Sequence, residues 1–249
     1  MSEELKVAIE AAKEGGKHAL KHYDKDLTVE LKDDNTPVTV ADKESEEVIK
    51  NHILKSFPNA KFVGEESGGS VDEDEFWTID PIDGTRSFNR GIPQWCTLIS
   101  LCKKEGPVIG VCYYPINNQL MYAERGHGAY LNGEKIHVSK INSFSNALLG
   151  YGNPRYVKNK KSLLRIIELA GSSRSWEATY SIFLLTQGKV DAFYDGYGFV
   201  WDVAPFKVIV EEAGGKITRP DGSTWSYKGR GCVATNGLLH DEVIKLINN

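Results

Sequence analysis

The sequence lacks the features that mark secreted, membrane-spanning and nucleic-acid-binding proteins. It has only four cysteines in 249 residues, and they form no Cys-x-x-Cys pair, so neither a disulfide framework nor a zinc site is indicated. No apolar run approaches the roughly 20 residues that span a bilayer, and the charged N-terminus lacks the apolar segment of a signal peptide. The chain has no Lys/Arg-rich run and a formal net charge of −4, which argues against nucleic acid as a partner. We therefore expect a cytoplasmic protein with buried free thiols and with no membrane or nucleic-acid partner.

Enough hydrophobic residues are present for a large buried core. They make up 41% of the 249 residues, a length that allows one large domain or two closely packed halves. No repeat, low-complexity segment or flexible linker divides the chain. We predict a single domain over residues 1–249, in which an N-terminal half (about 1–140) and a C-terminal half (about 141–249) complete one site together.

The N-terminal half begins with two predicted helices. Apolar residues at helical spacing cover residues 5–23. The polar segment 32–39 contains a proline and predicts a loop. Thr39 and Asp42 then resemble a capping arrangement for a second helix, which Pro58 ends. An acidic residue is favoured in the first turn of a helix, so capping alone would explain Asp42.

Two different patterns follow. Short β-rich runs separated by turn residues predict strands at 97–102, 108–114, 120–124, 129–131 and 135–138. Asn132-Gly133, between the last two, is a strong hairpin signal. The C-terminal half alternates, with strands expected at 148–151, 190–194, 216–218 and 231–235 and helices at 160–170, 178–187, 202–213 and 238–247. Pro205 is expected in the first turn of its helix, where proline is tolerated. The combination predicts a layered α+β fold.

The most informative segment is residues 80–85, Asp-Pro-Ile-Asp-Gly-Thr. Proline disfavours the helical conformation of the residue before it, so Asp80 is expected to end the apolar strand 76–79. Gly84 permits a sharp turn, after which the chain can enter a short helix. The two carboxylates and the Ile82 carbonyl can then converge on one point.

The same segment offers both kinds of group that a phosphate ester requires. Oxygen ligands suit a hard cation such as Mg²⁺. The amides of Gly84 and Thr85, at a helix start, suit a phosphate. An Asp-x-x-Asp pair alone is more often a capped surface turn, but two further acids occupy comparable places: Glu65 follows an apolar pair, and Asp202 precedes a strongly patterned helix. Together they predict a metal site for cleaving a phosphate ester.

With these motifs identified, the chain resembles the inositol monophosphatase superfamily of lithium-sensitive, Mg²⁺-dependent phosphatases. The resemblance covers nearly the whole chain and rests on ordered motifs at residues 36–42, 64–67, 80–85, 201–204 and 212–215. It implies a layered α-β-α-β-α sandwich, usually a homodimer. It also implies hydrolysis of a small phosphate monoester by metal-activated water, with two or three Mg²⁺ ions that Mn²⁺ could replace.

The resemblance assigns roles residue by residue. The metal ligands would be the carboxylates of Glu65, Asp80, Asp83 and Asp202, with the Ile82 carbonyl. Glu65 and Thr85 would position the attacking water, and Asp42 would hold Thr85 or a further metal. The amides of Gly84 and Thr85 would take the phosphate. The substrate contacts would come from Asp83, Asp195, Glu177 and Asp202.

Within the superfamily, the sequence is most similar to the histidinol-phosphate phosphatase branch. The segments 36–39, 83–88 and 91–99 carry that similarity. Asp195 and Glu177 would suit the cationic amine and imidazole of histidinol, although both could equally be ordinary solvated acids. Trp176 could narrow the pocket, stack on a flat ring or belong to the core.

Three alternatives remain open at this point. The substrate could be inositol 1-monophosphate, fructose 1,6-bisphosphate or a phosphonucleotide. The protein could instead be a non-catalytic metal- or phosphate-binding regulator, although the intact acidic set argues against that. Finally, His18 and His22 have the i, i+4 spacing of a metal-binding pair, but no third ligand is near in sequence, so an ordinary surface role is expected.

Overall fold

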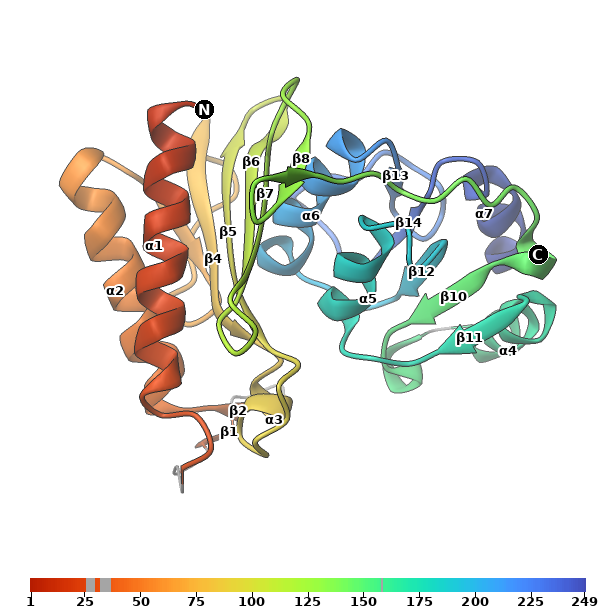
Figure 1. Cartoon of the computed structure of the whole chain (residues 1–249), viewed down its shortest axis with the longest axis horizontal. Coiled ribbons are helices and arrows are strands. Elements are labelled where there is room, and N and C mark those ends of the chain that lie inside the picture. The colour runs from red at the N-terminus through yellow and green to blue at the C-terminus, as the bar shows by residue number, and fades with distance from the viewer. Residues whose placement is uncertain (26–29, 32–36, 158) are drawn as a thin grey trace.

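The computed structural model describes residues 1–25, 30–31, 37–157 and 159–249. Helices and sheets alternate from one side of the molecule to the other: a helix pair, a sheet, a second pair of helices, a second sheet and outer helices (Figure 1). This is the predicted α-β-α-β-α sandwich. None of the helices among the described residues is long and apolar enough to cross a membrane.

The first layer is the pair α1 (Glu3–Leu20) and α2 (Val40–Ser56). Ser2 begins α1 by accepting a hydrogen bond from the Leu5 amide at 3.1 Å. Thr39 and Asp42 form the predicted capping box of α2. The apolar faces of both helices pack with one face of the first sheet in a shared core.

The first sheet has the order β3-β4-β5-β6-β7-β8-β9. Its strands are β3 (Phe62–Gly64), β4 (Glu75–Asp83), β5 (Cys96–Lys103), β6 (Gly106–Tyr114), β7 (Gln119–Glu124), β8 (Ala129–Leu131) and β9 (Glu134–Lys135). Among the described strands of this sheet, only β3 and β4 pair in parallel, and the others form the predicted antiparallel meander. The hairpin at Asn132-Gly133 is confirmed, with φ of 51° and 88° at the two turn residues. Its second strand ends at Lys135, earlier than predicted.

Helices α5 (Ala178–Leu185) and α6 (Val200–Glu212) lie between the two sheets. The largest core cluster joins these helices to residues of both sheets. The start of α6 differs from the prediction, because the helix begins at Val200 and Pro205 therefore lies in its interior rather than in its first turn. The added turn begins where the Asp202 carboxylate accepts a hydrogen bond from the Phe199 amide at 2.8 Å.

The second sheet has the order β11-β10-β12-β14-β13. Its strands are β10 (Leu148–Tyr151), β11 (Ser172–Arg174), β12 (Ala192–Asp195), β13 (Lys216–Thr218) and β14 (Cys232–Thr235). Helices α4 (Lys160–Leu169) and α7 (His240–Asn248) share a core cluster with this sheet. Strand β11 is absent from the sequence prediction because Ser-Ser-Arg at a sheet edge carries no apolar alternation.

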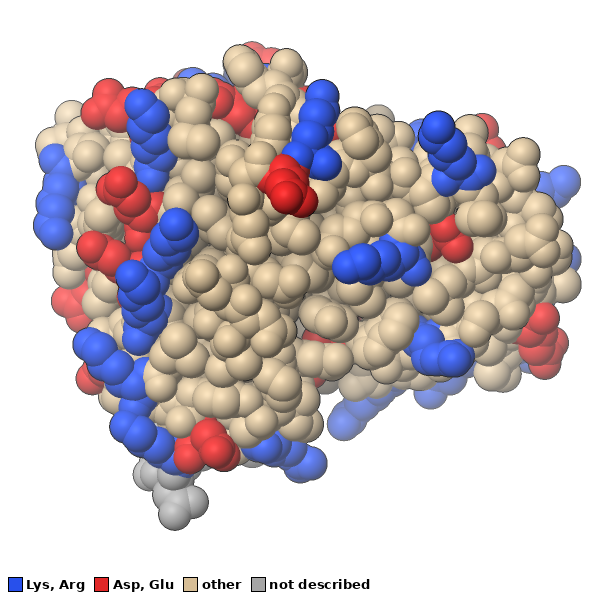
Figure 2. Space-filling model, in the orientation of Figure 1, with Lys and Arg blue, Asp and Glu red and all other residues tan. Residues whose placement is uncertain are grey.

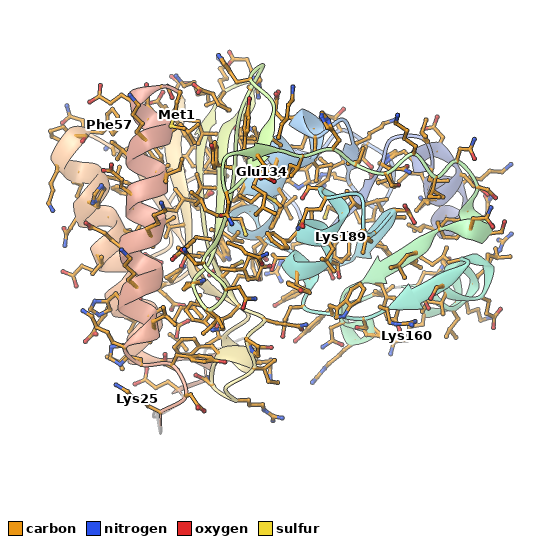
Figure 3. The ribbon with its side chains drawn as sticks, viewed as in Figure 1. Met1, Lys25, Phe57, Glu134, Lys160 and Lys189 are labelled. Carbon is orange, nitrogen blue, oxygen red and sulfur yellow. The ribbon has the colours of Figure 1, made fainter. Side chains whose placement is uncertain are left out.

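Short elements complete the fold: β1 (Glu30–Leu31), β2 (Pro37–Val38), α3 (Thr85–Phe88), η1 (Phe144–Asn146) and η2 (Pro154–Tyr156). The sequence predicted a loop over residues 32–39. Its C-terminal part instead contains β2, which pairs with β1. Residues 32–36 of the predicted loop lie outside the described residues. Side chains fill the space between the layers (Figure 3). On the face shown in Figure 2, acidic and basic residues are interspersed. All four cysteines are buried free thiols, as predicted.

Candidate active site

The Asp80–Asp83 segment is a bulged strand rather than a strand end followed by a turn. Strand β4 continues through Pro81 to Asp83, and Asp80 pairs with Leu98 while Asp83 pairs with Cys96. Three steps on β4 therefore oppose two steps on β5, which is the signature of a β-bulge. Side chains three residues apart point to opposite faces of a regular strand, so the extra residue is what brings both carboxylates to the same side.

Polar contacts hold the bulge in this shape. The Asp80 carboxylate accepts a hydrogen bond from the Ile82 amide at 3.0 Å. The Pro81 carbonyl accepts one from the Thr97 hydroxyl at 2.9 Å. Proline has no N–H to offer the β4–β5 ladder, and such residues are tolerated at bulges. The sequence prediction ended the strand at Asp80 because it read the proline only as a strand terminator.

Gly84 turns the chain from β4 into α3. It has φ of +90°, and a side chain there would meet the Gln94 carbonyl oxygen at 2.8 Å, so the position requires glycine. Helix α3 begins at Thr85, where the first amides of a helix have no intrahelical partner. This places the predicted phosphate-binding amides of Gly84 and Thr85 next to the Asp83 carboxylate.

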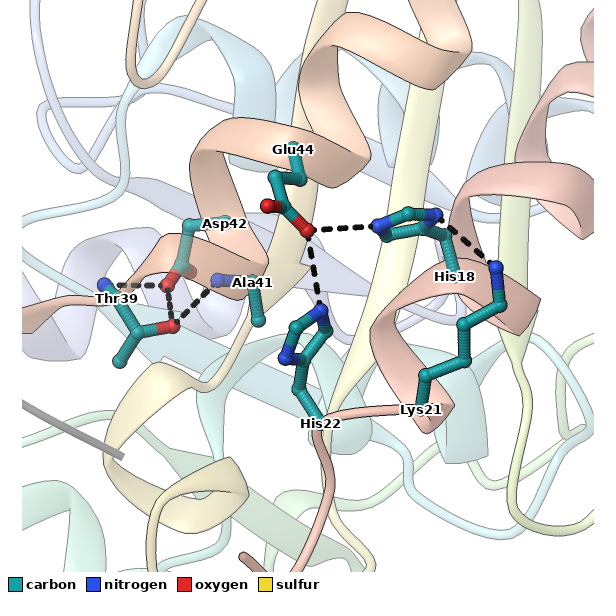
Figure 4. A network of polar contacts seen from close by, with 7 residues as sticks. All are labelled: His18, Lys21, His22, Thr39, Ala41, Asp42 and Glu44. Atoms are coloured by element: carbon teal, nitrogen blue, oxygen red, sulfur yellow. Dashed lines mark hydrogen bonds and ion pairs between the residues drawn. The ribbon is translucent and has the colours of Figure 1, made fainter. Parts of the chain in front are cut away.

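Thr85 and Asp42 form a buried polar link between the first sheet and α2. The Thr85 hydroxyl lies 3.1 Å from the Ile82 carbonyl and 3.3 Å from Asp42 Oδ1. Asp42 Oδ2 accepts hydrogen bonds from the amide and the hydroxyl of Thr39 at 2.7 and 2.6 Å (Figure 4). Asp42 is therefore a helix cap, as its position in the sequence predicts, and it also contacts the catalytic candidate Thr85.

The third carboxylate comes from the other half of the chain. Asp202 lies in the first turn of α6, and oxygens of Asp80, Asp83 and Asp202 all fall within 4.8 Å of one another. Asp80 is buried and the other two are half-buried. The structure thus brings Asp202 to Asp80 and Asp83, which lie more than a hundred residues earlier in the chain.

Glu65 faces this acidic cluster from the end of β3. Its amide donates to the Ile79 carbonyl at 3.0 Å, which places it beside Asp80 because β3 and β4 run in parallel. A buried glutamate, Glu46 of α2, supports this loop by accepting a hydrogen bond from the Glu66 amide at 2.9 Å and pairing with Lys50 at 2.6 Å. Nothing in the sequence marks Glu46, because its position resembles any polar position of a helix.

The crowded acids resist ionisation. Burial, followed by the charges of Glu65, Asp83 and Asp202, raises the pKa of Asp80 well above its usual value. Burial and the charge of Asp202 likewise raise the pKa of Asp83, while a hydrogen bond from Thr179 lowers it. Burial and the charge of Glu65 raise the pKa of Asp202 to about 7. Repulsion between these carboxylates destabilises their ionised forms, and a bound cation would stabilise them.

The residues present fit a hard divalent cation. Asp80, Asp83 and Asp202 offer carboxylate oxygens within 4.8 Å of one another, and oxygen donors are the ligands that Mg²⁺ and Mn²⁺ prefer. Within the described part of the chain, no lysine or arginine forms an ion pair with Asp80, Asp83 or Asp202. Among the ion pairs of the described residues, none therefore neutralises these three carboxylates.

A cavity of about 570 Å³ opens from the acidic cluster toward the C-terminal half, within the usual size range for small-molecule sites. Its walls include Asp83, Thr85, Trp176, Glu177, Asp195 and Asp202. The cavity is therefore acidic at its base and partly aromatic along its side.

The two predicted substrate acids both line this cavity, and both already have protein partners. Asp195, at the end of β12, is buried and accepts hydrogen bonds from the amides of Tyr197 at 3.1 Å and Gly198 at 2.7 Å. Burial raises the pKa of Asp195, and these amides oppose that effect. Glu177 accepts a hydrogen bond from the Ser87 hydroxyl at 2.6 Å. Neither residue is an ordinary solvated acid.

Trp176 and Thr179 also belong to this wall. Trp176 lines the cavity and also packs edge-on against Tyr180 with ring centroids 6.5 Å apart, so it belongs to both the pocket and the core. Thr179 hydrogen-bonds the Asp83 carboxylate across the cleft between the halves. No sequence motif marks Thr179, because its role arises only from its contact with Asp83, 96 residues away.

Comparisons with known proteins agree with this site. The chain matches the family model described as "Inositol monophosphatase family" over residues 1–249. A histidinol-phosphatase of Streptomyces coelicolor is 34% identical over 235 residues, which cover 90% of this chain and 88% of that protein. Inositol monophosphatase 3 of Solanum lycopersicum is 37% identical over 258 residues, which cover 98% and 96%. The crystal structure of extragenic suppressor protein SuhB from Bartonella henselae has a TM-score of 0.92 at 28% identity, covering 100% of this chain and 99% of that one.

The chain therefore belongs to the inositol monophosphatase family. It is a phosphatase of this metal-dependent family, which acts on small phosphate esters. Relatives at similar identity are named for different substrates, so their names do not determine the substrate of this chain.

Proposed function

We propose that this protein hydrolyses histidinol phosphate in a Mg²⁺-dependent reaction at the site between its two halves, with residues 1–249 acting as one phosphatase domain. The observation that supports this proposal is the position of Asp195 and Glu177, which line the same cavity as the acidic cluster. A substrate with its phosphate at that cluster would direct its leaving group toward these two acids. Carboxylates in the cavity wall stabilise a bound cationic amine more strongly than a bound neutral polyol, because their hydrogen bonds to a cation are charge-assisted.

Different residues of the chain would bind the cations and the phosphate. The carboxylates of Glu65, Asp80, Asp83 and Asp202 and the Ile82 carbonyl would hold the divalent cations. Bound cations of this kind neutralise the phosphate, lower the pKa of water and stabilise the leaving alkoxide. The amides of Gly84 and Thr85 would bind the phosphate oxygens.

Glu65 and Thr85 would orient the attacking water, with the Glu65 carboxylate accepting its proton. Asp42 fixes the Thr85 hydroxyl through their 3.3 Å contact, and Thr39 in turn fixes Asp42. Thr85 is thus preorganised by a buried chain of polar groups, which lowers the reorganisation needed in the transition state. Asp195 and Glu177 would orient the leaving group.

The experiment is a panel of kcat/KM values measured with histidinol phosphate, inositol 1-phosphate, fructose 1,6-bisphosphate and a phosphonucleotide, each with and without Mg²⁺. We expect the value for histidinol phosphate to exceed the others by at least about tenfold. A preference of that size for inositol 1-phosphate would mean that inositol 1-phosphate, and not histidinol phosphate, is the substrate. The proposed Mg²⁺-dependent hydrolysis would stand. Absence of phosphate release from every monoester would contradict the proposed reaction itself.

Two isosteric variants sharpen the substrate assignment. Asp195→Asn and Glu177→Gln remove a charge but keep an acceptor oxygen, so each should lower kcat/KM for histidinol phosphate by about 10–100-fold. Both should change kcat/KM for inositol 1-phosphate by less than about threefold. Glu168→Gln, on an exposed position of α4, is the matched control and should leave both values unchanged. Equal losses for the two substrates would show that these acids do not discriminate by charge.

We further propose that the active form is a cytoplasmic homodimer. The four buried free thiols are consistent with a reducing compartment. Light scattering of the purified protein measures the subunit number directly, and a monomeric mass at working concentration would contradict the dimer.

A further inference from the structure

Two histidines at the end of α1 and one glutamate of α2 form a second cluster of potential metal ligands (Figure 4). His18 lies in the last turn of α1, and His22 follows in the turn that continues it, where its amide bonds the Ala19 carbonyl at 2.9 Å. Glu44, from the second turn of α2, faces both rings. The sequence showed the histidine pair without a third ligand, and the packing of α1 against α2 supplies one.

The three side chains already converge on one point. Glu44 Oε2 lies 3.0 Å from His18 Nε2 and 3.1 Å from His22 Nε2. Ligand atoms about 2.0–2.1 Å from a tetrahedral Zn²⁺ are separated from each other by roughly 3.3 Å. Both rings present the same nitrogen, and one ligand atom of each residue lies within 4.8 Å of the others. Small rotations of surface side chains would therefore complete the geometry.

The donor set differs in kind from that of the candidate active site. Two imidazole nitrogens and one carboxylate favour Zn²⁺, Ni²⁺ or Cu²⁺, whereas the acidic cluster offers only oxygen and favours Mg²⁺ or Mn²⁺. The side chains of His18, His22 and Glu44 are 22%, 24% and 46% exposed. An ion can therefore reach them from solvent, and a water molecule would fill the fourth position.

The Lys21 side chain contacts His18 in a way that is incompatible with metal binding. Its ammonium lies 3.5 Å from His18 Nδ1, which acts as the acceptor in that contact. A histidine that binds a metal through Nε2 carries its proton on Nδ1 and needs an acceptor there. The lysine would have to move away, and its positive charge would weaken binding.

We propose that His18, His22 and Glu44 form a transition-metal site, best suited to Zn²⁺, that links the end of α1 to the beginning of α2. The alternative is a pair of ordinary His–Glu hydrogen bonds on the surface, with no metal. The linked segment of α2 also carries Asp42, two residues before Glu44, so the site lies on the outer side of the helix turn that supports Thr85. The proposal is independent of the substrate and of the proposed reaction.

The first test is calorimetric titration of the full-length protein with Zn²⁺ in excess Mg²⁺. We expect one Zn²⁺ per chain, and a melting temperature higher by roughly 5–10 °C at a Zn²⁺ concentration about 100 times the Kd. The double variant His18→Ala/His22→Ala should lose both effects. His52→Ala removes another surface imidazole that contacts two glutamates, Glu14 at 2.9 Å and Glu10 at 3.6 Å, and should behave like the wild type.

The second test separates this site from the acidic one by ligand type. Electron paramagnetic resonance of Cu²⁺ bound at one equivalent should show nitrogen couplings from two imidazoles in the wild type and none in the double variant. Lys21→Gln supplies an acceptor for His18 Nδ1 and should tighten Zn²⁺ binding by about tenfold. A Cu²⁺ spectrum without imidazole couplings, or equal Zn²⁺ binding by the wild type and the double variant, would overturn the proposal. Neither result depends on phosphatase activity.

Discussion

The two halves of the molecule contribute to the candidate active site in different ways. The N-terminal half supplies Glu65, the residues 80–85 and Asp42 from the edge of one seven-stranded sheet and the helix beside it. The C-terminal half supplies Asp202, Asp195 and Glu177 from three separate elements. Most of the groups proposed to hold cations and phosphate thus occur in short local motifs, whereas those proposed to recognise the leaving group are dispersed.

This difference follows from what each half has to position. Cations and a phosphate require several oxygens and amides within a few ångströms, and a bulge followed by a tight turn provides them within six residues. A leaving group lies farther away and contacts whatever side chains the second sheet and its helices present. Asp202 is the exception, because it belongs to the C-terminal half but completes the acidic cluster.

Removal of a carboxylate from each half should give the largest contrast. Asp83→Asn should lower kcat/KM by at least about a thousandfold for every substrate, roughly 4 kcal/mol of transition-state stabilisation. Asp195→Asn should lower it mainly for a cationic substrate, as described above. Steady-state kinetics on both substrates, with circular dichroism as the check on folding, measures the contrast.

Asp241→Asn is the matched control for this pair, because its side chain is 95% exposed and contacts only Lys216 among the interactions described. We expect it to retain wild-type kinetics. Near-normal turnover in Asp83→Asn would mean that the N-terminal motif does not hold the reacting centre.

The pH dependence of stability should separate the contribution of Asp202. Its pKa, raised to about 7, means that the folded metal-free protein binds more protons than the unfolded chain between about pH 4 and 7. The free energy of unfolding therefore falls as pH rises through this window. Since Asp202 is half-buried, we expect an effect on the order of 1–3 kcal/mol, measured by thermal melting in a chelator from pH 5 to pH 8.

The comparison to make is with Asp202→Asn, whose stability should depend less steeply on pH. Burial lowers the pKa of His240 to about 4, and that group acts in the opposite sense below about pH 6.5. His240 is present in both proteins, so its contribution cancels when the pH dependence of stability of Asp202→Asn is subtracted from that of the wild type. Mg²⁺ should restore the stability of the wild type at pH 8, and an identical pH profile for both proteins would contradict the assigned charge repulsion.

The smallest effect should come from the support that α2 gives to Thr85. Thr39→Ala removes the hydroxyl that donates to Asp42 at 2.6 Å and should cost about 1 kcal/mol of stability as a lost helix cap. Because Asp42 then holds Thr85 less firmly, we expect kcat to fall by about 3–10-fold. Thr39→Ser keeps the hydroxyl and should restore both values. Chemical denaturation and steady-state kinetics would show it, and a loss of stability with unchanged kcat would limit Thr39 to capping.

Sequence patterns predicted the layered architecture well where periodicity was strong. The helix at residues 5–23, the meander and the helix predicted at 202–213 all appear, with shifts of a few residues at their ends. The prediction failed where the same local sequence is compatible with two backbone conformations. Pro81 can end a strand or occupy a bulge, and only the partner strand β5, with the Thr97 hydroxyl beneath the Pro81 carbonyl, selects the bulge.

The same limit applied to side chains whose roles depend on contacts distant in sequence. Thr179, Glu46 and Glu44 resemble ordinary polar residues of helices, and the contacts that define their roles are made with residues 20 to 96 positions away. By contrast, the ligand candidates Asp80 and Asp83 were found because proline and glycine beside them constrain the backbone.

Neighbouring residues in the sequence specify the helix and strand periods, the buried thiols and the acidic segment at the end of β4. The tertiary structure alone decided that Asp202 meets Asp80 and Asp83, that Thr179 contacts Asp83, and that Glu44 faces His18 and His22. The physical reason is that charge repulsion, burial and ligand geometry act through space over a few ångströms, and only packing of the layers brings distant residues within that range.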